Sequence, residues 1–422
     1  KGVKKRDSAH TLEFSTLHEE VMGDKSTINY YLLLIVRIFI NFADSLFYIV
    51  SIFMISKSFD NPVYTGIAVS IFTLPDLLLL FIGPIIDRVN PKKILLVSII
   101  AQIVAVLFLL LNFEGMNILF LYTLLFVSSF SSAISYPLEE SMIPNIVEKN
   151  RIIEANSIFH IAYEIIDAIF NGISGLLLAI FAYKSLYRAN LYILLLAFIP
   201  IFLFKHKRNN NRIHENYSLA EYRNDLKEGI IFVKNSYCLI SVSLPLIIIN
   251  LYNALNATVL PYYCGFYNEP ELFFGYITIA SGVGGIVGGI ISSTISKKIK
   301  PGRLLFISLF LKGLFWILAV ISGKPFFSLL LFGLSYVFSA VGNTVFSAFF
   351  QLFPPENMVG RVNTIIDTVI TIAMPLGGFL GGYVLRFVSP IFIYGFFGVI
   401  VIIVSTLFGR KKMIEVINKT FL

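Results

Sequence analysis

Charged and amide side chains interrupt the apolar runs of this sequence, and several of them recur at helical spacing. The first half of the chain carries two such sets and one isolated acid: Arg37, Asn41 and Asp44; Glu164, Asp167 and Asn171; and Asp76. Residues three or four positions apart share one face of a helix. Because an ionisable side chain in hydrocarbon costs about 3 kcal/mol or more, we expect these faces to line a wet internal cavity.

The chemistry open to such groups is the binding and release of protons. A carboxylate that is partly shielded from water can bind a proton near physiological pH. We expect Asp44, Asp167 and Glu164 to carry protons, with Asp76 next, and Arg37 to act as their counter-charge. The alternative is that Arg37 and one acid form a permanent buried pair that only fixes helix packing.

The second half of the chain offers amides and a single acid within its apolar runs. These residues are Asn250, Asn253, Asn256, Asn343 and Asp367. The first three stand at steps of three and belong to one predicted helix. Aromatic residues make up 15% of the chain, and some of them should add an apolar, stacking surface. We expect a substrate cavity here.

The elements that position these residues are membrane-spanning helices. Of the 422 residues, 57% are apolar and only 14% are charged, which excludes a soluble globular protein. A spanning helix needs about 20 mostly apolar residues. Twelve runs qualify: 29–56, 64–86, 93–112, 118–138, 155–182, 189–204, 237–264, 272–296, 304–322, 326–349, 360–386 and 391–408. The predicted fold class is an all-α membrane protein with twelve transmembrane helices.

The twelve helices divide into two similar halves. Residues 91–98 align with 301–308, and Pro144 aligns with Pro354, at one common offset. We therefore expect two pseudo-symmetric six-helix bundles, 29–204 and 237–408. A cytoplasmic extension (1–28, of which 1–21 is left out of the fold reasoning), a linker (205–236) and a cytoplasmic tail (409–422) complete the chain. Within the linker, 219–233 is amphipathic and lies either on the membrane surface or in solvent.

The distribution of basic residues predicts the orientation. Lys and Arg concentrate in alternate loops and in both termini, and cytoplasmic loops retain positive charge. The opposite loops hold only Lys57, Lys184, Arg188, Lys324 and Arg386. Both termini of this multi-pass protein should therefore face the cytoplasm, in a bacterial cytoplasmic (inner) membrane.

A short motif follows the second apolar run. Residues 83–93 read GPIIDRVNPKK, which resembles the loop between helices 2 and 3 of the major facilitator superfamily, with Asn90 and Pro91 where a glycine and a basic residue are usual. Asn tolerates the left-handed backbone conformation, so the first change is mild. The alternative is a merely basic cytoplasmic loop.

Three further stretches resemble one branch of that superfamily, which contains macrolide efflux pumps and the enterobactin exporter. They are residues 137–147 with 155–156 downstream, residues 225–233, and residues 354–362 leading to 375–378. The resemblance implies alternating access, in which two bundles rock about a central cavity. It also implies a cytoplasmic gate comprising Gly83, Asp87, Arg88, Lys93 and Arg361. It places the helix of Lys312 at the periphery, where the side chain would snorkel or pair with a neighbouring helix.

These observations favour a proton-coupled secondary exporter of a small or medium amphipathic molecule: a drug, a siderophore or a short peptide. An uptake symporter of the same fold and a non-transporting receptor or assembly partner are the alternatives. An enzyme is not expected, since no serine–histidine or metal constellation lies within a span and the five histidines show no metal-ligand spacing. No nucleotide-binding loop is present, so ATP is not expected to drive transport directly. The expected partners are the substrate and the lipid bilayer, with no nucleic acid. We expect a monomer without cofactors, driven by the proton gradient.

Overall fold

The computed structural model describes residues 25–86, 90–115, 117–147, 166–167, 169–204, 219–355 and 358–421, and within these ranges every regular element is a helix. The first half contains α2 (Lys25–Ser58), α3 (Val63–Ile86), α4 (Pro91–Leu111), the 3-10 helix η1 (Phe113–Gly115), α5 (Ile118–Ile146) and α7 (Tyr183–Leu203). The second contains α9 (Tyr237–Cys264), α10 (Pro270–Ile295), α11 (Pro301–Ile321), α12 (Pro325–Leu352), α13 (Val359–Thr371), α14 (Met374–Val384) and α15 (Pro390–Phe408). Two further helices are α8 (Leu219–Asn235), between the halves, and α16 (Lys411–Thr420), after α15.

Ten helices of the described chain are long and apolar enough to cross a membrane, with α13 and α14 together forming one of them. Two shorter apolar helices, Val63–Leu79 and Ile169–Ile180, lie where the other two of the twelve predicted spans fall. The predicted all-α class is therefore confirmed. Helix α8 also forms where the amphipathic pattern of the linker predicts a helix.

Local sequence explains where many of these helices begin. Proline occupies the first position of α4, α10, α11, α12 and α15. Its fixed backbone angle suits that position, where no amide hydrogen is needed for the helix. The side chain of Asn90 accepts a hydrogen bond from the Lys92 amide and so caps α4. Each of these prolines thus marks the start of a helix.

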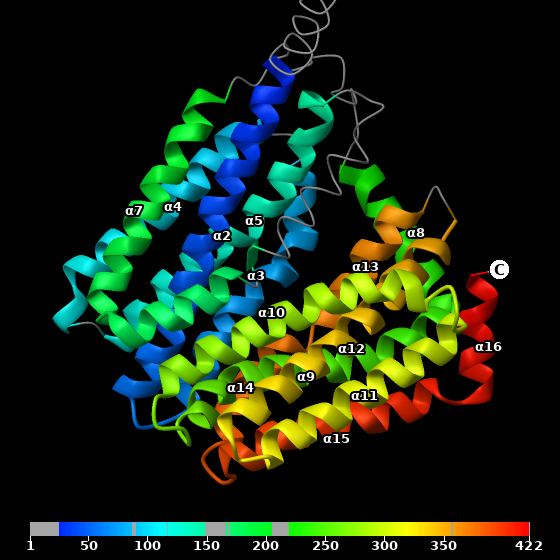
Figure 1. Cartoon of the computed structure of the whole chain (residues 1–422). Coiled ribbons are helices and arrows are strands. Elements are labelled where there is room, and N and C mark those ends of the chain that lie inside the picture. Colours follow the sequence, from blue (N-terminus) through cyan, green and yellow to red (C-terminus); the bar gives the residue numbers. More distant parts are fainter. Residues whose placement is uncertain are drawn as a thin grey trace, which may run out of the picture.

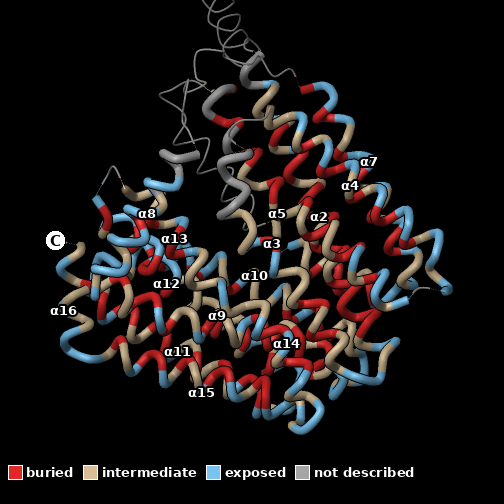
Figure 2. Tube along the Cα trace, turned by 180° about the vertical axis from the view of Figure 1, so that it is seen from behind, coloured by how far each residue is buried: buried red, intermediate tan, exposed pale blue. Residues whose placement is uncertain are grey.

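The apolar side chains separate into an interior and an outer belt. Figure 2 shows buried residues where helices pack on one another and exposed residues on the outside of the molecule. On α4, the exposed large apolar residues recur at steps of three and four: Val97, Ile100, Val104, Leu107, Phe108 and Leu111. Such a stripe on the outside of a helical bundle would face lipid.

The helices form two groups that meet at α3 and α14. In Figure 1 the helices α2, α4, α5 and α7 run upward, whereas α9, α10, α11 and α15 run across the picture beneath them. Within the first group α2 packs on α7, and α4 packs on α5; within the second, α12 packs on α10 and α11, and α15 packs on α11. Contact between the groups runs chiefly through α3 and α14.

Glycines allow the two halves to approach closely. A Cβ atom built on Gly66 of α3 would lie 2.7 Å from the carbonyl oxygen of Gly378 and 3.0 Å from the Cα of Gly382, both in α14. A Cβ on Gly175 would lie 2.6 Å from the Cα of Gly275 in α10. Since these neighbours are backbone atoms, any side chain at these positions would force the halves apart.

Polar contacts join the halves at the same end. Lys57 Nζ lies 3.5 Å from Glu271 Oε1, and Ser70 Oγ donates a hydrogen bond of 2.6 Å to the Pro375 carbonyl oxygen. Lys57 is at the end of α2 farthest from the N-terminus, which is the predicted external end. In this structure the halves are therefore joined at the predicted external side.

Several predicted helix bounds were wrong. Helix α5 continues to Ile146, and α7 already begins at Tyr183. In both cases a charged residue bounds the predicted span without ending the helix: Glu139 lies within α5, and Arg188 lies within α7. Lys184, in the first turn of α7, pairs with Glu114 at 2.9 Å. The apolar composition predicts only the part of a helix that lies in the hydrocarbon core of the membrane. The backbone hydrogen bonds of the helix continue beyond it, through turns that carry charged residues.

The predicted helix 360–386 also differs from the structure, and the predicted tail contains a helix that the sequence analysis did not identify. The former is interrupted between Thr371 and Met374, directly before Pro375. Proline lacks an amide hydrogen and clashes with the preceding turn, which explains the break. The tail contains α16, an amphipathic helix that packs against α11, α12 and α15 and buries Ile417. It escapes a search for apolar runs because only one of its faces is apolar.

Candidate functional site

The first half encloses a cavity of about 410 Å³ between α2, α3, α5 and the helix that contains Asn171. Six residues singled out in the sequence line it: Arg37, Asn41, Asp44, Asp76, Asp167 and Asn171. Glu164 lies outside the described residues. The helical faces that carry these residues are thus turned toward one interior space rather than toward lipid.

Two polar contacts connect α2 and α5 beside this cavity. Arg37 Nη1 donates to Glu139 Oε2 at 3.3 Å, and Ser132 Oγ donates to Asp44 Oδ2. Arg37 and Asp44 are seven residues apart on α2, and Ser132 and Glu139 are seven apart on α5. Because the helices are antiparallel, this shared spacing of two turns aligns the two contacts.

The Arg37–Glu139 ion pair is removed from water. The two side chains are 4% and 0% exposed, and the Arg37 guanidinium also lies 5.2 Å from the centroid of the Tyr136 ring. Sequence reasoning did not select Glu139, because it stands at the polar end of the predicted fourth helix. Glu139 lies two helical turns after Ser132. This spacing places the two residues on one face only if the helix continues past residue 138, as α5 does.

The other acids of this cavity come from different helices. Asn171 Nδ2 donates to Asp167 Oδ2 at 2.9 Å, and Asp76, on α3, is exposed to the cavity. Carboxylates from three helices therefore gather around one polar space that also contains a buried arginine. Such an arrangement can accept a proton at several positions.

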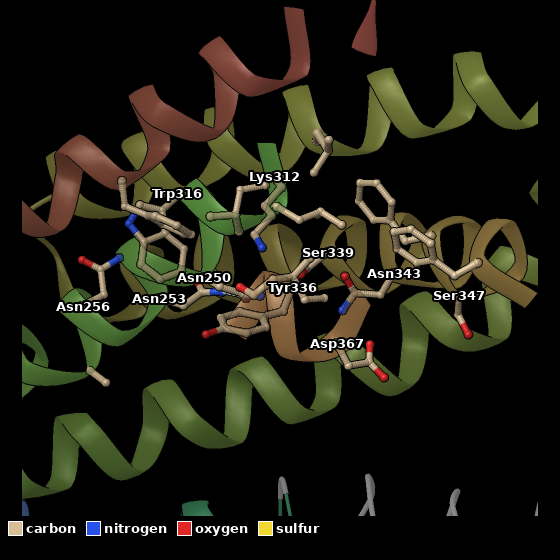
Figure 3. Close-up of a pocket in the computed structure, with 18 of the residues that line it drawn as sticks. Asn250, Asn253, Asn256, Lys312, Trp316, Tyr336, Ser339, Asn343, Ser347 and Asp367 are labelled. Carbon is tan, nitrogen blue, oxygen red and sulfur yellow. Dashed lines mark hydrogen bonds between the residues drawn. The ribbon is translucent and has the colours of Figure 1, made fainter. Parts of the chain in front are cut away.

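The second half encloses a larger cavity, of about 730 Å³, between α9, α11, α12, α13 and α15. All five residues predicted for this half line it (Asn250, Asn253, Asn256, Asn343 and Asp367), and Figure 3 shows them around it. Asn250 Nδ2 donates to the Ile370 carbonyl oxygen at 3.0 Å, and Asn253 Nδ2 contacts Asn250 Oδ1 at 3.4 Å. Amide groups thus join α9 to the broken span formed by α13 and α14.

The expectation that the Lys312 side chain snorkels from its peripheral helix to the membrane surface was wrong. Lys312 lines the second cavity, and Figure 3 shows its amine pointing into that space. The amine lies 5.6 Å from the centroid of the Phe397 ring of α15. A helix at the edge of a bundle still has one inward face, and Lys312 is on that face of α11.

Three of the five predicted gate residues lie in the described part of the chain. Gly83 lies in the last turns of α3, and Lys93 is exposed on the first turn of α4, whereas Asp87 and Arg88 lie outside the described residues. Arg361, near the start of α13, donates from Nη1 to Glu228 Oε2 of α8 at 2.9 Å. Figure 1 shows α8 beside α13. In this structure Arg361 therefore contacts the linker helix.

Two six-helix groups with a polar cavity in each define a multi-pass membrane protein of the transporter type. The Major Facilitator Superfamily model matches residues 32–378 of the chain. The chain belongs to this superfamily, whose two-bundle architecture matches the predicted fold.

Related proteins agree with this assignment. Over 372 residues, 83% of this chain and 84% of the relative, the chain is 26% identical to "Uncharacterized MFS-type transporter YkuC" of Bacillus subtilis (strain 168). A crystal structure of the nucleoside transporter NupG matches with a TM-score of 0.70 at 11% identity, covering 90% of this chain and 98% of that one. A POT family transporter in complex with 5-aminolevulinic acid matches with a TM-score of 0.67 at 14% identity, covering 89% and 94%. At such identities the two solved structures support the fold alone.

Proposed function

We propose that this protein is a proton-coupled secondary exporter of a small or medium amphipathic molecule, working by alternating access. The observation that carries the proposal is the first cavity, which is lined by Asp44, Asp76 and Asp167 and by Arg37 of the buried Arg37–Glu139 pair. Ionisable groups are held inside a membrane protein at a free-energy cost, and they mark ion or proton pathways. A cluster with both signs can take up one proton and redistribute its contacts.

In the proposed cycle the Arg37–Glu139 pair is the element that responds to a proton. Protonation of Glu139 removes the charge that Arg37 neutralises, and the guanidinium then turns to another acid of the same cavity. Asp44 is the candidate, since it lies two turns along the same helix face and is held by Ser132. Exchange of partners between α2 and α5 would change the packing of these helices and favour one arrangement of the halves over the other.

The contact between the halves is the part of the structure that must open and close. The glycines of α3 and α14 let backbones touch at the predicted external side. In the other arrangement we expect this contact to be broken and the cytoplasmic gate to close, with Asp87, Arg88 and Arg361 joined. Arg361 would then exchange its Glu228 contact for Asp87.

Export, rather than uptake, is favoured by the three stretches that resemble the macrolide-efflux and enterobactin-exporter branch. The proposed substrate is accordingly a drug, a siderophore or a short peptide. The proposed location is the bacterial cytoplasmic membrane, with both termini in the cytoplasm, as the basic loops predict.

A flux assay in proteoliposomes with an imposed pH gradient tests this function, screened over drugs, metallophores and short peptides. We expect substrate to move against the direction of proton flow, and the Asp44→Asn variant to lose this dependence on the gradient. Glu114→Gln, which changes an exposed acid of η1, is the matched control and should behave as the parent protein. Substrate movement that ignores the gradient would exclude proton coupling, and movement together with protons would identify an uptake symporter. Normal cellular function after neutralisation of every cavity acid would favour a receptor.

A further inference from the structure

A lysine in the middle of a membrane span needs an explanation that the proton pathway does not provide. Lys312 is the twelfth residue of α11, about 16 Å along the axis from its first residue and roughly 14 Å from its last. Its side chain cannot bridge such a distance to reach the membrane surface. Within the described part of the chain, no ion pair involves its amine. Its charge is therefore directed into the second cavity, and no carboxylate of the described residues lies within ion-pair distance of it.

The surroundings of Lys312 suit an organic anion. Among the described residues that line this cavity, Lys312 is the one basic residue and Asp367 the one acid. Lys312 comes from α11 and Asp367 from α13, and Figure 3 shows them on opposite sides of the cavity. Asp367 is exposed, so water screens its charge, whereas Lys312 is partly buried. An anion beside Lys312 would thus meet an attraction that is stronger than the repulsion from Asp367.

A second observation points independently to a bound polar group. Asn256 lines the same cavity and is 5% exposed, and neither atom of its amide has a hydrogen-bond partner among the described residues. A buried amide without partners is costly, so a ligand that supplies a donor or acceptor there would be favoured. Trp316 and Tyr394 supply an apolar wall beside it.

We propose that the cavity of the second half is a binding site for the carboxylate group of an amphipathic substrate, with Lys312 as the residue that binds the anion. The aromatic wall holds the apolar body of that substrate, and Asn256 bonds to a polar atom on it. This inference rests on the proposed transport function and narrows its substrate class to organic anions with an aromatic or apolar body.

The chain carries its own reporter for this site. Trp316 is the single tryptophan of the sequence, and it lines the cavity one turn after Lys312. Energy transfer from Trp316 to a dansyl group therefore reports ligand that is bound close to this wall. Dansylglycine and dansylglycinamide form a matched pair, because they differ in the charge of one group only.

The experiment is a titration of the purified full chain in lipid nanodiscs with each compound. We expect saturable energy transfer, with half-saturation by the acid at about ten-fold lower concentration than by the amide. Lys312→Gln should abolish this preference, and Lys312→Arg should keep it. Asp367→Asn, which removes the negative charge of the same cavity, should strengthen it. Lys184→Gln changes a lysine outside both cavities and should leave it unaltered.

Three results would overturn the proposal: no saturable transfer from the acid, equal half-saturation by acid and amide, or a preference for the acid that persists in Lys312→Gln. Helical content by circular dichroism shows that each variant is folded. The titration needs neither a gradient nor substrate movement, so its failure leaves the proposed transport open, and failure of the flux assay leaves the binding result intact.

Discussion

The buried ion pair of the first cavity allows a prediction that separates a structural role from a coupling role. At the observed N–O distance of 3.3 Å, and with an effective dielectric constant of about 20, the two charges attract each other by about 5 kcal/mol. Glu139→Gln removes one charge and breaks this buried ion pair. Loss of one partner of a buried pair costs about 3–5 kcal/mol, so we expect the free energy of unfolding to fall by that amount.

The double variant Arg37→Met, Glu139→Met removes both charges. Since the desolvation of both groups is then avoided, we expect stability within about 1 kcal/mol of the parent protein. Unfolding by SDS in mixed micelles, followed by far-ultraviolet circular dichroism, measures these differences. Glu114→Gln breaks an exposed ion pair and serves as the control, with no expected change in the unfolding midpoint.

Transport by the double variant then decides the role of the pair. If the pair only fixes the packing of α2 and α5, the stable double variant should move substrate in response to a pH gradient as the parent protein does. Under the coupling mechanism, it should fold but lose that response. A Glu139→Gln protein as stable as the parent would refute this cost, and would show that Asp44, to which the proposed cycle turns the guanidinium, replaces Glu139 in full.

Three further predictions concern the contacts between the halves and the gate. Gly66→Ala places a methyl group against backbone, so we expect transport to fall about ten-fold or more, whereas Gly285→Ala, at a position with open space, should transport normally in the same flux assay. Lys57→Glu should lower the fraction of molecules whose halves are joined at the predicted external side by up to about five-fold, as measured by cysteine accessibility. Adding Glu271→Lys should restore that fraction. A double variant no better than the single one would exclude the pair as a contact between the halves. Asp87→Asn should reduce flux while expression is unchanged, and normal flux would contradict a latch at the cytoplasmic gate.

Some features of this protein follow from its sequence because they depend on local properties of the chain. Apolar runs long enough to span a bilayer set the number and place of the spans. The helical period places Arg37, Asn41 and Asp44 on one face, whatever the rest of the fold does. Because buried charge is costly, that face had to turn inward, and it lines the first cavity.

Other features depend on which helices touch, and only the tertiary structure decides that. Arg37 pairs with Glu139, which is 102 residues away in the sequence. The packing of α5 on α2 brings the two together, and the spacing of residues along the chain does not predict that packing. The inward direction of Lys312 likewise follows from the rotation of α11 about its axis. The contacts of α11 with α12 and α15 set that rotation. The composition of α11 does not, because a largely apolar helix can turn any of its faces toward the interior.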